Sequence, residues 1–337
     1  MSHQPPPLHR KSSAPWDRLR PIKQDPLESF GFVSKGDNRL LSFKNQENYY
    51  HKITARYMQF CTHHSKNLNE AFASLSLGET RSDVSNESQS APLNDTTVWK
   101  GKPTTPAYFS KQGTNTKALG SSTPVPSDPA EELTNILTAL RKLREAILAT
   151  SRDATSPVFS QRVHVFNIRL AILALHPESY HASLRYLLTS LHSREHPLPV
   201  PELREMAAYL ILDTALRECD LNQAHCIRVT AKERWGFRHK DVDLILWAIA
   251  TDNWPLFWRL RARVDGYIRA IMHWKLDSLR RSVLKSIGKS YMKCDIDWIL
   301  RGTTGSEMSW EELVVKEDVG WSREGNIAII RKPKLKG

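Results

Sequence analysis

The stretch NWPLFWRLRARVDGYIRAIMHWK, residues 253–275, decides how this chain is expected to fold. Wound as an α-helix at about 100° per residue, it places apolar side chains on two separate faces. One face carries Leu256, Phe257, Leu260 and Val264, and the far face carries Trp254, Trp258 and Ala262. A helix that is apolar on two sides needs a neighbour on each, so the stretch predicts a helix held inside a stack.

The arginines of the same stretch raise the alternative that it binds nucleic acid. Arg259 and Arg263 fall in one gap between the two apolar faces, and Arg261 falls near the other gap. A nucleic-acid groove needs its cations together, so that they follow a phosphate backbone. Because these arginines diverge, we interpret the stretch as structural, the last hairpin of a helical stack.

The chain before this stretch has helical periodicity from Pro129 onwards. The sequence Asp128-Pro129 is a helix start signal, and Pro177 and the proline-rich loop at residues 197–201 are stop signals. Helices are expected over residues 128–148, 161–175, 178–192, 201–218, 221–235 and 240–250. The links are short and no strand alternation separates the helices. Residues 129–275 are therefore predicted to form an all-α helical-repeat stack of antiparallel hairpins.

The last part of the chain, residues 276–337, has a different pattern. A helix over LDSLRRSVLKSIGKSY is followed by the short apolar segment MKCDIDWILRG, and a third helix starts at the capping box formed by Ser309 and Glu312. The segment GNIAIIRKPK then predicts a strand after Gly325. This order is that of a winged-helix module, here with a basic tail.

The first part of the chain, residues 1–128, is rich in Ser, Thr, Pro, Asn and Gln and is expected to be mostly disordered. A possible amphipathic helix at about residues 46–64 interrupts it, with an apolar stripe of Tyr50, Ile53, Tyr57 and Phe60. Such a stripe either docks on the folded domain or captures a partner.

Composition limits the cell compartment and the partners. The 337 residues carry a formal charge of +12, which suits a polyanionic partner without specifying a site. The N-terminus lacks the apolar core of a secretion signal, and no apolar run is long enough to span a bilayer. We therefore expect a cytoplasmic or nuclear protein, or both, with no membrane partner.

Sequence motifs of catalysis are missing, so no enzyme, cofactor or metal site is predicted. There is no GxxxxGK[ST] or GxGxxG loop, no GxSxG elbow and no HExxH helix. The four cysteines, Cys61, Cys219, Cys226 and Cys294, are too scattered for a disulfide framework or a paired zinc motif. Cys219 and Cys226, beside His225, are expected to be buried, inert thiols.

A helical stack that runs into a winged helix resembles the PCI family, the scaffold subunits of the proteasome lid, the COP9 signalosome and translation initiation factor 3. The segments that carry the resemblance are TDNWPLFWRL (251–260), SLRRSVLKSIGKSY (278–291) and EDVGWSREGNIAIIRKPK (317–334). The small subunits of that family are the most similar. The related GANP group of mRNA-export scaffolds is a second candidate, through EMAAYLIL (205–212). The resemblance implies a non-catalytic assembly subunit whose partners are other PCI-domain subunits.

Two surfaces are candidates for partner contact. Arg281, Lys285 and Lys289 share one side of their helix, opposite Leu279, Val283 and Ile287, and would meet RNA or an acidic partner if the side is more than a solvated face. The predicted final strand supplies a candidate strand-edge interface, formed by Ile327, Ala328, Ile329, Ile330 and Arg331.

The third helix of the module carries acidic residues, which argues against DNA reading through it. The leading function is thus a scaffold subunit that joins partners through the strand edge and the helical stack. The alternative is an RNA-binding adaptor in mRNA export or RNA processing.

Overall fold

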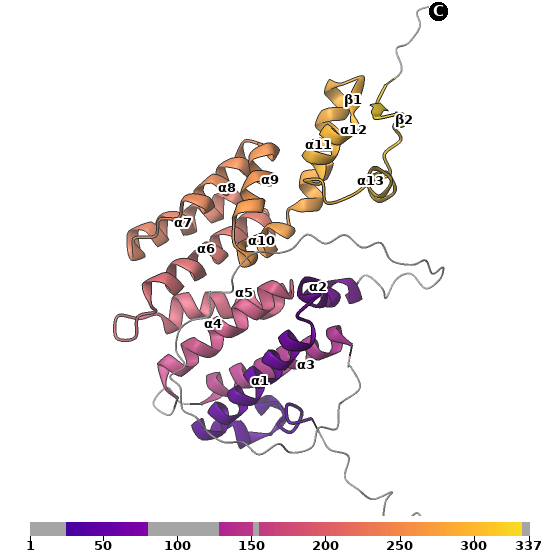
Figure 1. The fold of residues 1–337 in the computed structure, drawn as a ribbon. Helices are drawn as coiled ribbons and strands as arrows, with labels where there is room; N and C mark the ends of the chain where they lie inside the picture. The colour runs from indigo at the N-terminus through magenta and orange to yellow at the C-terminus, as the bar shows by residue number, and fades with distance from the viewer. Residues whose placement is uncertain (1–24, 80–127, 151–154, 332–337) are drawn as a thin grey trace, which may run out of the picture.

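A computed structural model describes residues 25–79, 128–150 and 155–331 of the chain. Figure 1 shows helices α1 to α10 layered one on another, with a separate small module at the end of the chain. The described part is mostly helical, and its strands all belong to one small sheet in that module. The prediction of a mostly helical fold with a small C-terminal module that contains the strands is confirmed.

The middle of the stack begins with helices whose first turns contain proline. Asp128 caps the first of them, its carboxylate accepting from the Ala130 amide at 3.2 Å. Proline is suited to this position because its missing N–H would have no helical partner there. The helices are α3 (Pro129–Ala149), α4 (Pro157–Leu173), α5 (Pro177–Tyr186) with a π-helical turn at Leu187–Leu191, and α6 (Val200–Leu216).

The stack continues through α7 (Leu221–Trp235), which packs against α6, and through the hairpin of α8 (Lys240–Ala250) and α9 (Trp254–Arg263). Helix α10 (Gly266–His273) packs back against α4 and α6. The opening stretch of the sequence analysis is thus two helices. The break comes at Val264, and the Asp265 carboxylate accepts from the Ile268 amide at 2.9 Å to start α10. An N-cap of this kind satisfies an amide that the new helix leaves unpaired.

The two apolar faces predicted for this stretch are both covered. Phe257 and Leu260 are buried on one face of α9. On the other face, the Trp258 ring N–H donates to the Gly302 carbonyl at 2.8 Å, and Trp254 meets Trp298 edge-to-face with ring centroids 5.5 Å apart. Helix α9 therefore has a neighbour on each face, as the pattern predicted, but the second neighbour is the C-terminal module rather than another helix of the stack.

The C-terminal module follows α10 directly. Its elements are α11 (Leu276–Ser290), β1 (Lys293–Asp295), α12 (Ile296–Thr303), α13 (Trp310–Glu317), β2 (Ser322–Glu324) and β3 (Ile327–Ile329). The three helices, the last strand and the capping box of Ser309 and Glu312 were all expected. Strands β1 and β2 were not. The sheet is antiparallel with the order β1-β3-β2.

Around the possible helix at about 46–64, the expectation of disorder is wrong for the rest of residues 25–79. This segment forms two short 3₁₀ turns, η2 (Val33–Lys35) and η3 (Asn38–Leu41), and two helices, α1 (Phe43–His63) and α2 (Leu68–Glu79). Helix α1 matches the predicted helix at about 46–64, beginning three residues earlier and ending one residue earlier. The rest of the region expected to be disordered, residues 1–24 and 80–127, lies outside the described residues.

The aromatic stripe of α1 explains why the segment folds. Tyr50 and Tyr57 meet Phe166 of α4 edge-to-face, at 5.8 and 5.3 Å between ring centroids. Arg56 also pairs with the largely buried Glu132 of α3 at 2.9 Å. Aromatic side chains bury large areas, so a few of them compensate for the polar composition around them. The stripe docks on the chain's own helical stack.

Hydropathy along the described helices gives one further result. None of them combines the length and the apolar character needed to cross a membrane.

The tryptophan face of α9 gives the first prediction. We expect Trp258→Ala to lower the free energy of unfolding by about 2–3 kcal/mol, because it removes a packed ring and its hydrogen bond to Gly302. Trp247→Ala on the neighbouring helix is the control, since Trp247 is 52% exposed and its loss is expected to cost less than about 0.5 kcal/mol. Urea unfolding of both variants measures the difference; equal losses would contradict the assignment.

Candidate functional site

Helix α11 presents the basic face that the sequence singled out. Arg281, Lys285 and Lys289 are all exposed, and the opposite side of the helix buries Leu279, Val283 and Ile287. The spacing of four residues therefore brings the three cations to one solvent-facing strip, as expected for a helix.

The three cations differ in how far they are neutralised. The Arg281 guanidinium lies 3.5 Å from a Glu317 oxygen, whereas Lys285 and Lys289 make no ion pair within the described part of the chain. Glu317 is held mainly by the buried Arg280, at 2.7 Å. The two lysines are thus the available positive charges of this face.

The final strand does not offer the free edge expected of it. Strand β3, which contains Ile327, Ala328 and Ile329, lies in the centre of the sheet and pairs with β1 on one side and β2 on the other. The amides of Ile330 and Arg331 both donate to the Met292 carbonyl, at 2.9 and 3.2 Å. The prediction of a strand edge at residues 327–331 is wrong because two short strands that sequence patterns did not reveal occupy both sides.

Strand β2 is one of the two outer strands of the sheet, so one of its sides is open. A two-residue turn, with Gly325 at φ +63°, joins Glu324 to Ile327, and such a turn closes on a hydrogen-bonded pair. Pairs alternate in an antiparallel ladder, so the backbone N–H and C=O of Arg323 face away from β3. All three residues of β2 are exposed.

The thiols expected to be buried are not. Cys219 and Cys226 are both exposed, and Cys219 has a positive φ of 58° in the turn that ends α6. Helix α7 lies at the surface and buries only Ala224 and Ala231 fully, so its polar side and Cys226 face solvent. The prediction failed because α7 was taken for a core helix.

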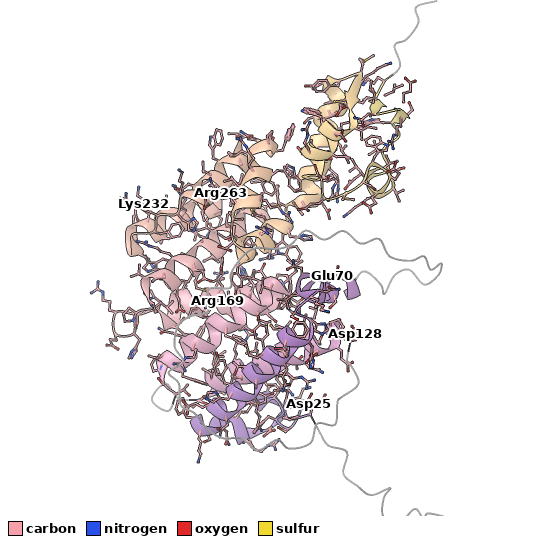
Figure 2. All side chains as sticks on the ribbon, viewed as in Figure 1. Asp25, Glu70, Asp128, Arg169, Lys232 and Arg263 are labelled. Atoms are coloured by element: carbon pink, nitrogen blue, oxygen red, sulfur yellow. The ribbon has the colours of Figure 1, made fainter. Side chains whose placement is uncertain are left out.

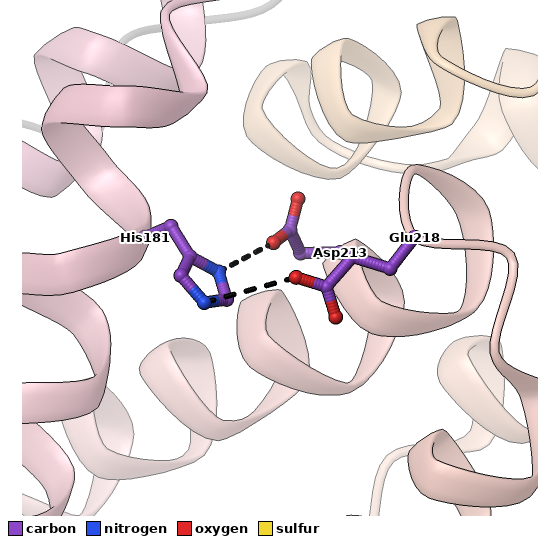
Figure 3. A group of neighbouring side chains, drawn as sticks. All are labelled: His181, Asp213 and Glu218. Carbon is purple, nitrogen blue, oxygen red and sulfur yellow. Dashed lines mark hydrogen bonds and ion pairs between the residues drawn. The ribbon is translucent and has the colours of Figure 1, made fainter.

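A cluster that the sequence analysis missed joins α5 and α6. His181, Asp213 and Glu218 converge in Figure 3, with the His181 Nδ1 3.0 Å from Asp213 and its Nε2 3.7 Å from Glu218. The signal available in the sequence was an aspartate inside the apolar run YLILDTALRE, followed four residues later by Arg217. Asp213 itself is fully buried.

The oxygens of Asp213 are already satisfied by neighbouring donors. The Arg217 guanidinium donates to both of them, at 2.7 and 2.6 Å, and the Tyr180 hydroxyl donates to one at 2.7 Å. Burial and the carboxylate together raise the pKa of Tyr180, so its hydroxyl keeps the proton that it donates. Three side chains that are able to ligate a metal ion, one imidazole and two carboxylates, do meet here. A cation would however have to displace Arg217, and we interpret the cluster as a structural network.

Comparison with known proteins does not assign the chain to a family. Neither the models of known protein families nor the curated proteins contain a match to this chain.

The network around Asp213 gives the second prediction. We expect Asp213→Ala to lower the free energy of unfolding by about 3 kcal/mol, because it leaves a buried hydroxyl and a guanidinium without their acceptor. Glu218→Ala removes a carboxylate from the exposed rim of the same cluster and is expected to cost less than about 1 kcal/mol. Chemical denaturation of the two variants provides the test, and a small effect of Asp213→Ala would show that the network contributes little.

Proposed function

We propose that the protein is a non-catalytic scaffold subunit that assembles with other helical-stack subunits through its C-terminal module. The observation that supports this most is the exposed β2 strand, whose outward backbone groups at Arg323 have no partner among the described residues. An unpaired strand edge favours the addition of a strand from another chain. We thus assign the strand-edge interface to β2 instead of to residues 327–331.

The architecture around β2 is suited to such a role. The order helix, strand, helix, helix, strand, strand with the sheet order β1-β3-β2 is that expected of a winged helix. Arg323 pairs with Glu311 of α13 at 2.6 Å, which steadies β2 against the helix. Val315 of α13 is 83% exposed, and an apolar side chain left in solvent adds to the contact area. The assembly that we propose is of the PCI type, because the sequence resembles the subunits of that family.

Substitution by proline tests the strand edge, and it is the third prediction. Arg323→Pro removes an N–H that faces away from β3, so the sheet itself loses no ladder hydrogen bond. We expect tagged wild-type chain to co-purify from its own cells in fixed stoichiometry with helical-stack subunits, and Arg323→Pro to lose them. Arg323→Ala, which keeps the N–H but loses the pair with Glu311, is the matched control and is expected to retain them. Recovery of the wild-type chain alone would refute the proposal.

A second candidate function is an RNA-binding adaptor that uses the basic face of α11. It is supported by the exposure of Lys285 and Lys289, neither of which makes an ion pair with an acidic side chain among the described residues. Cations in one row along a helix are able to follow a phosphate backbone.

Charge reversal tests the RNA candidate and is the fourth prediction. If the face binds single-stranded RNA, changing Arg281, Lys285 and Lys289 together to Glu should weaken binding at least about tenfold at low salt. It should also reduce the slope of log affinity against log salt by about two. Fluorescence anisotropy with a uridine oligomer measures both. The control reverses three exposed cations elsewhere, Lys44, Lys66 and Arg204; an equal loss in both variants would mean that only net charge matters.

A further inference from the structure

The turn between α7 and α8 forms a hollow that neither candidate function uses. Its volume is about 450 Å³, and its lining includes Arg228, Lys232, Arg238, Lys240 and Asp243. In Figure 2, Lys232 lies at the outer end of the stack, on the side away from the C-terminal module. The hollow is therefore separate from both α11 and β2.

The charge of the hollow is strongly positive. Four of its lining side chains are cations and one, Asp243, is an acid, which pairs with the Nε of Arg228. Hydrogen bonding to Asp243 raises the pKa of Arg228, so the guanidinium stays charged. Lys232, Arg238 and Lys240 are exposed and make no ion pair within the described part of the chain. One acid thus faces four cations, and the excess is left for a ligand.

The backbone contributes to the same potential. The hollow contains His239 and Lys240, the cap and the first residue of α8. The amino end of a helix carries a partial positive charge from its aligned peptide dipoles. An anion in the hollow would therefore meet side-chain cations from α7, from the loop and from α8, and a helix terminus as well.

An apolar strip continues from the hollow along α8. Leu244 lines the hollow, and Trp247 follows it on the same face of the helix, seven residues after Lys240. Trp247 is 52% exposed, which is unusual for the largest apolar side chain. A ligand that enters the hollow would thus have an apolar surface beside its charged group.

We propose that this hollow binds a phosphorylated serine or threonine in an extended segment of a partner protein, with an apolar residue next to the phosphate resting on Leu244 and Trp247. A phosphate monoester carries close to two negative charges and three acceptor oxygens. Clusters of arginine and lysine recognise it through charge-assisted hydrogen bonds. The four cations converge on one hollow, whereas a nucleic-acid strand carries one charge per phosphate and requires cations spread along a track.

The test uses the full chain and short fluorescent peptides that contain one phosphoserine followed by leucine. We expect the phosphorylated peptide to bind at least about tenfold more tightly than the same peptide without phosphate. Lys232→Glu combined with Lys240→Glu should abolish this difference. Lys285→Glu combined with Lys289→Glu, the same charge change on α11, should leave it intact. Binding that ignores phosphorylation, or that the α11 pair reduces equally, would overturn the proposal.

Two further arms assign the source of the phosphate and the role of the tryptophan. Replacing the leucine of the peptide by alanine should weaken binding to wild-type chain and have no effect on a Trp247→Ala variant. A uridine oligomer should fail to displace the phosphopeptide at equal phosphate concentration; displacement would assign the hollow to nucleic acid and overturn the proposal. Failure of this proposal leaves assembly through β2 untouched, because Arg323→Pro lies in a different part of the fold.

Discussion

The contact between α9 and the C-terminal module is the constraint on which the arrangement of the molecule depends. Trp254 and Trp258 need a flat surface, and Gly302 and Gly305 supply it, since a Cβ on Gly302 would come within 2.9 Å of the Trp254 ring. Gly305 also has a φ of +63°, a conformation that favours glycine. Larger side chains at these positions would push the module away. The orientation of the basic face and of β2 relative to the stack therefore depends on two glycines that bear no functional group.

Buried and partly buried polar groups also hold the helices of the stack in place. Asn167 of α4 donates to the Ser179 carbonyl at 2.8 Å, and Arg169 pairs with Glu205 of α6 through two hydrogen bonds, at 2.9 and 2.6 Å. Apolar packing alone tolerates sliding between helices, whereas directional hydrogen bonds in the interior tolerate little. Together with Asp213, these contacts set the register of α4, α5 and α6, and they contribute specificity more than net stability.

Periodicity predicted much of this fold, and the failures have physical causes. Helices α3 to α9 follow from apolar spacing and from proline or Asx start signals, which are local. Strands β1 and β2 have three residues each and bury almost nothing, so no alternation marks them. They exist because β3 supplies the hydrogen-bonding partner on each side. Periodicity predicted the stripe that carries Tyr50 and Tyr57 and left open whether it docks on the chain itself. The order of the residues around that helix was missed for a related reason: composition averages over a segment, whereas a few aromatic side chains decide its burial.

The candidate surfaces show the same division between local and non-local information. Helical spacing alone places Lys285 and Lys289 together, because they belong to one helix. The hollow at α7 and α8 combines cations from two helices and the loop between them, namely Arg228, Lys232, Arg238 and Lys240. Only the fold shows that Asp243 pairs with Arg228 and leaves the other three cations without an acidic partner among the described residues. A charge of +12 spread over the chain therefore does not locate a binding site. What locates one is the difference, at each place, between the cations present and the acids close enough to neutralise them.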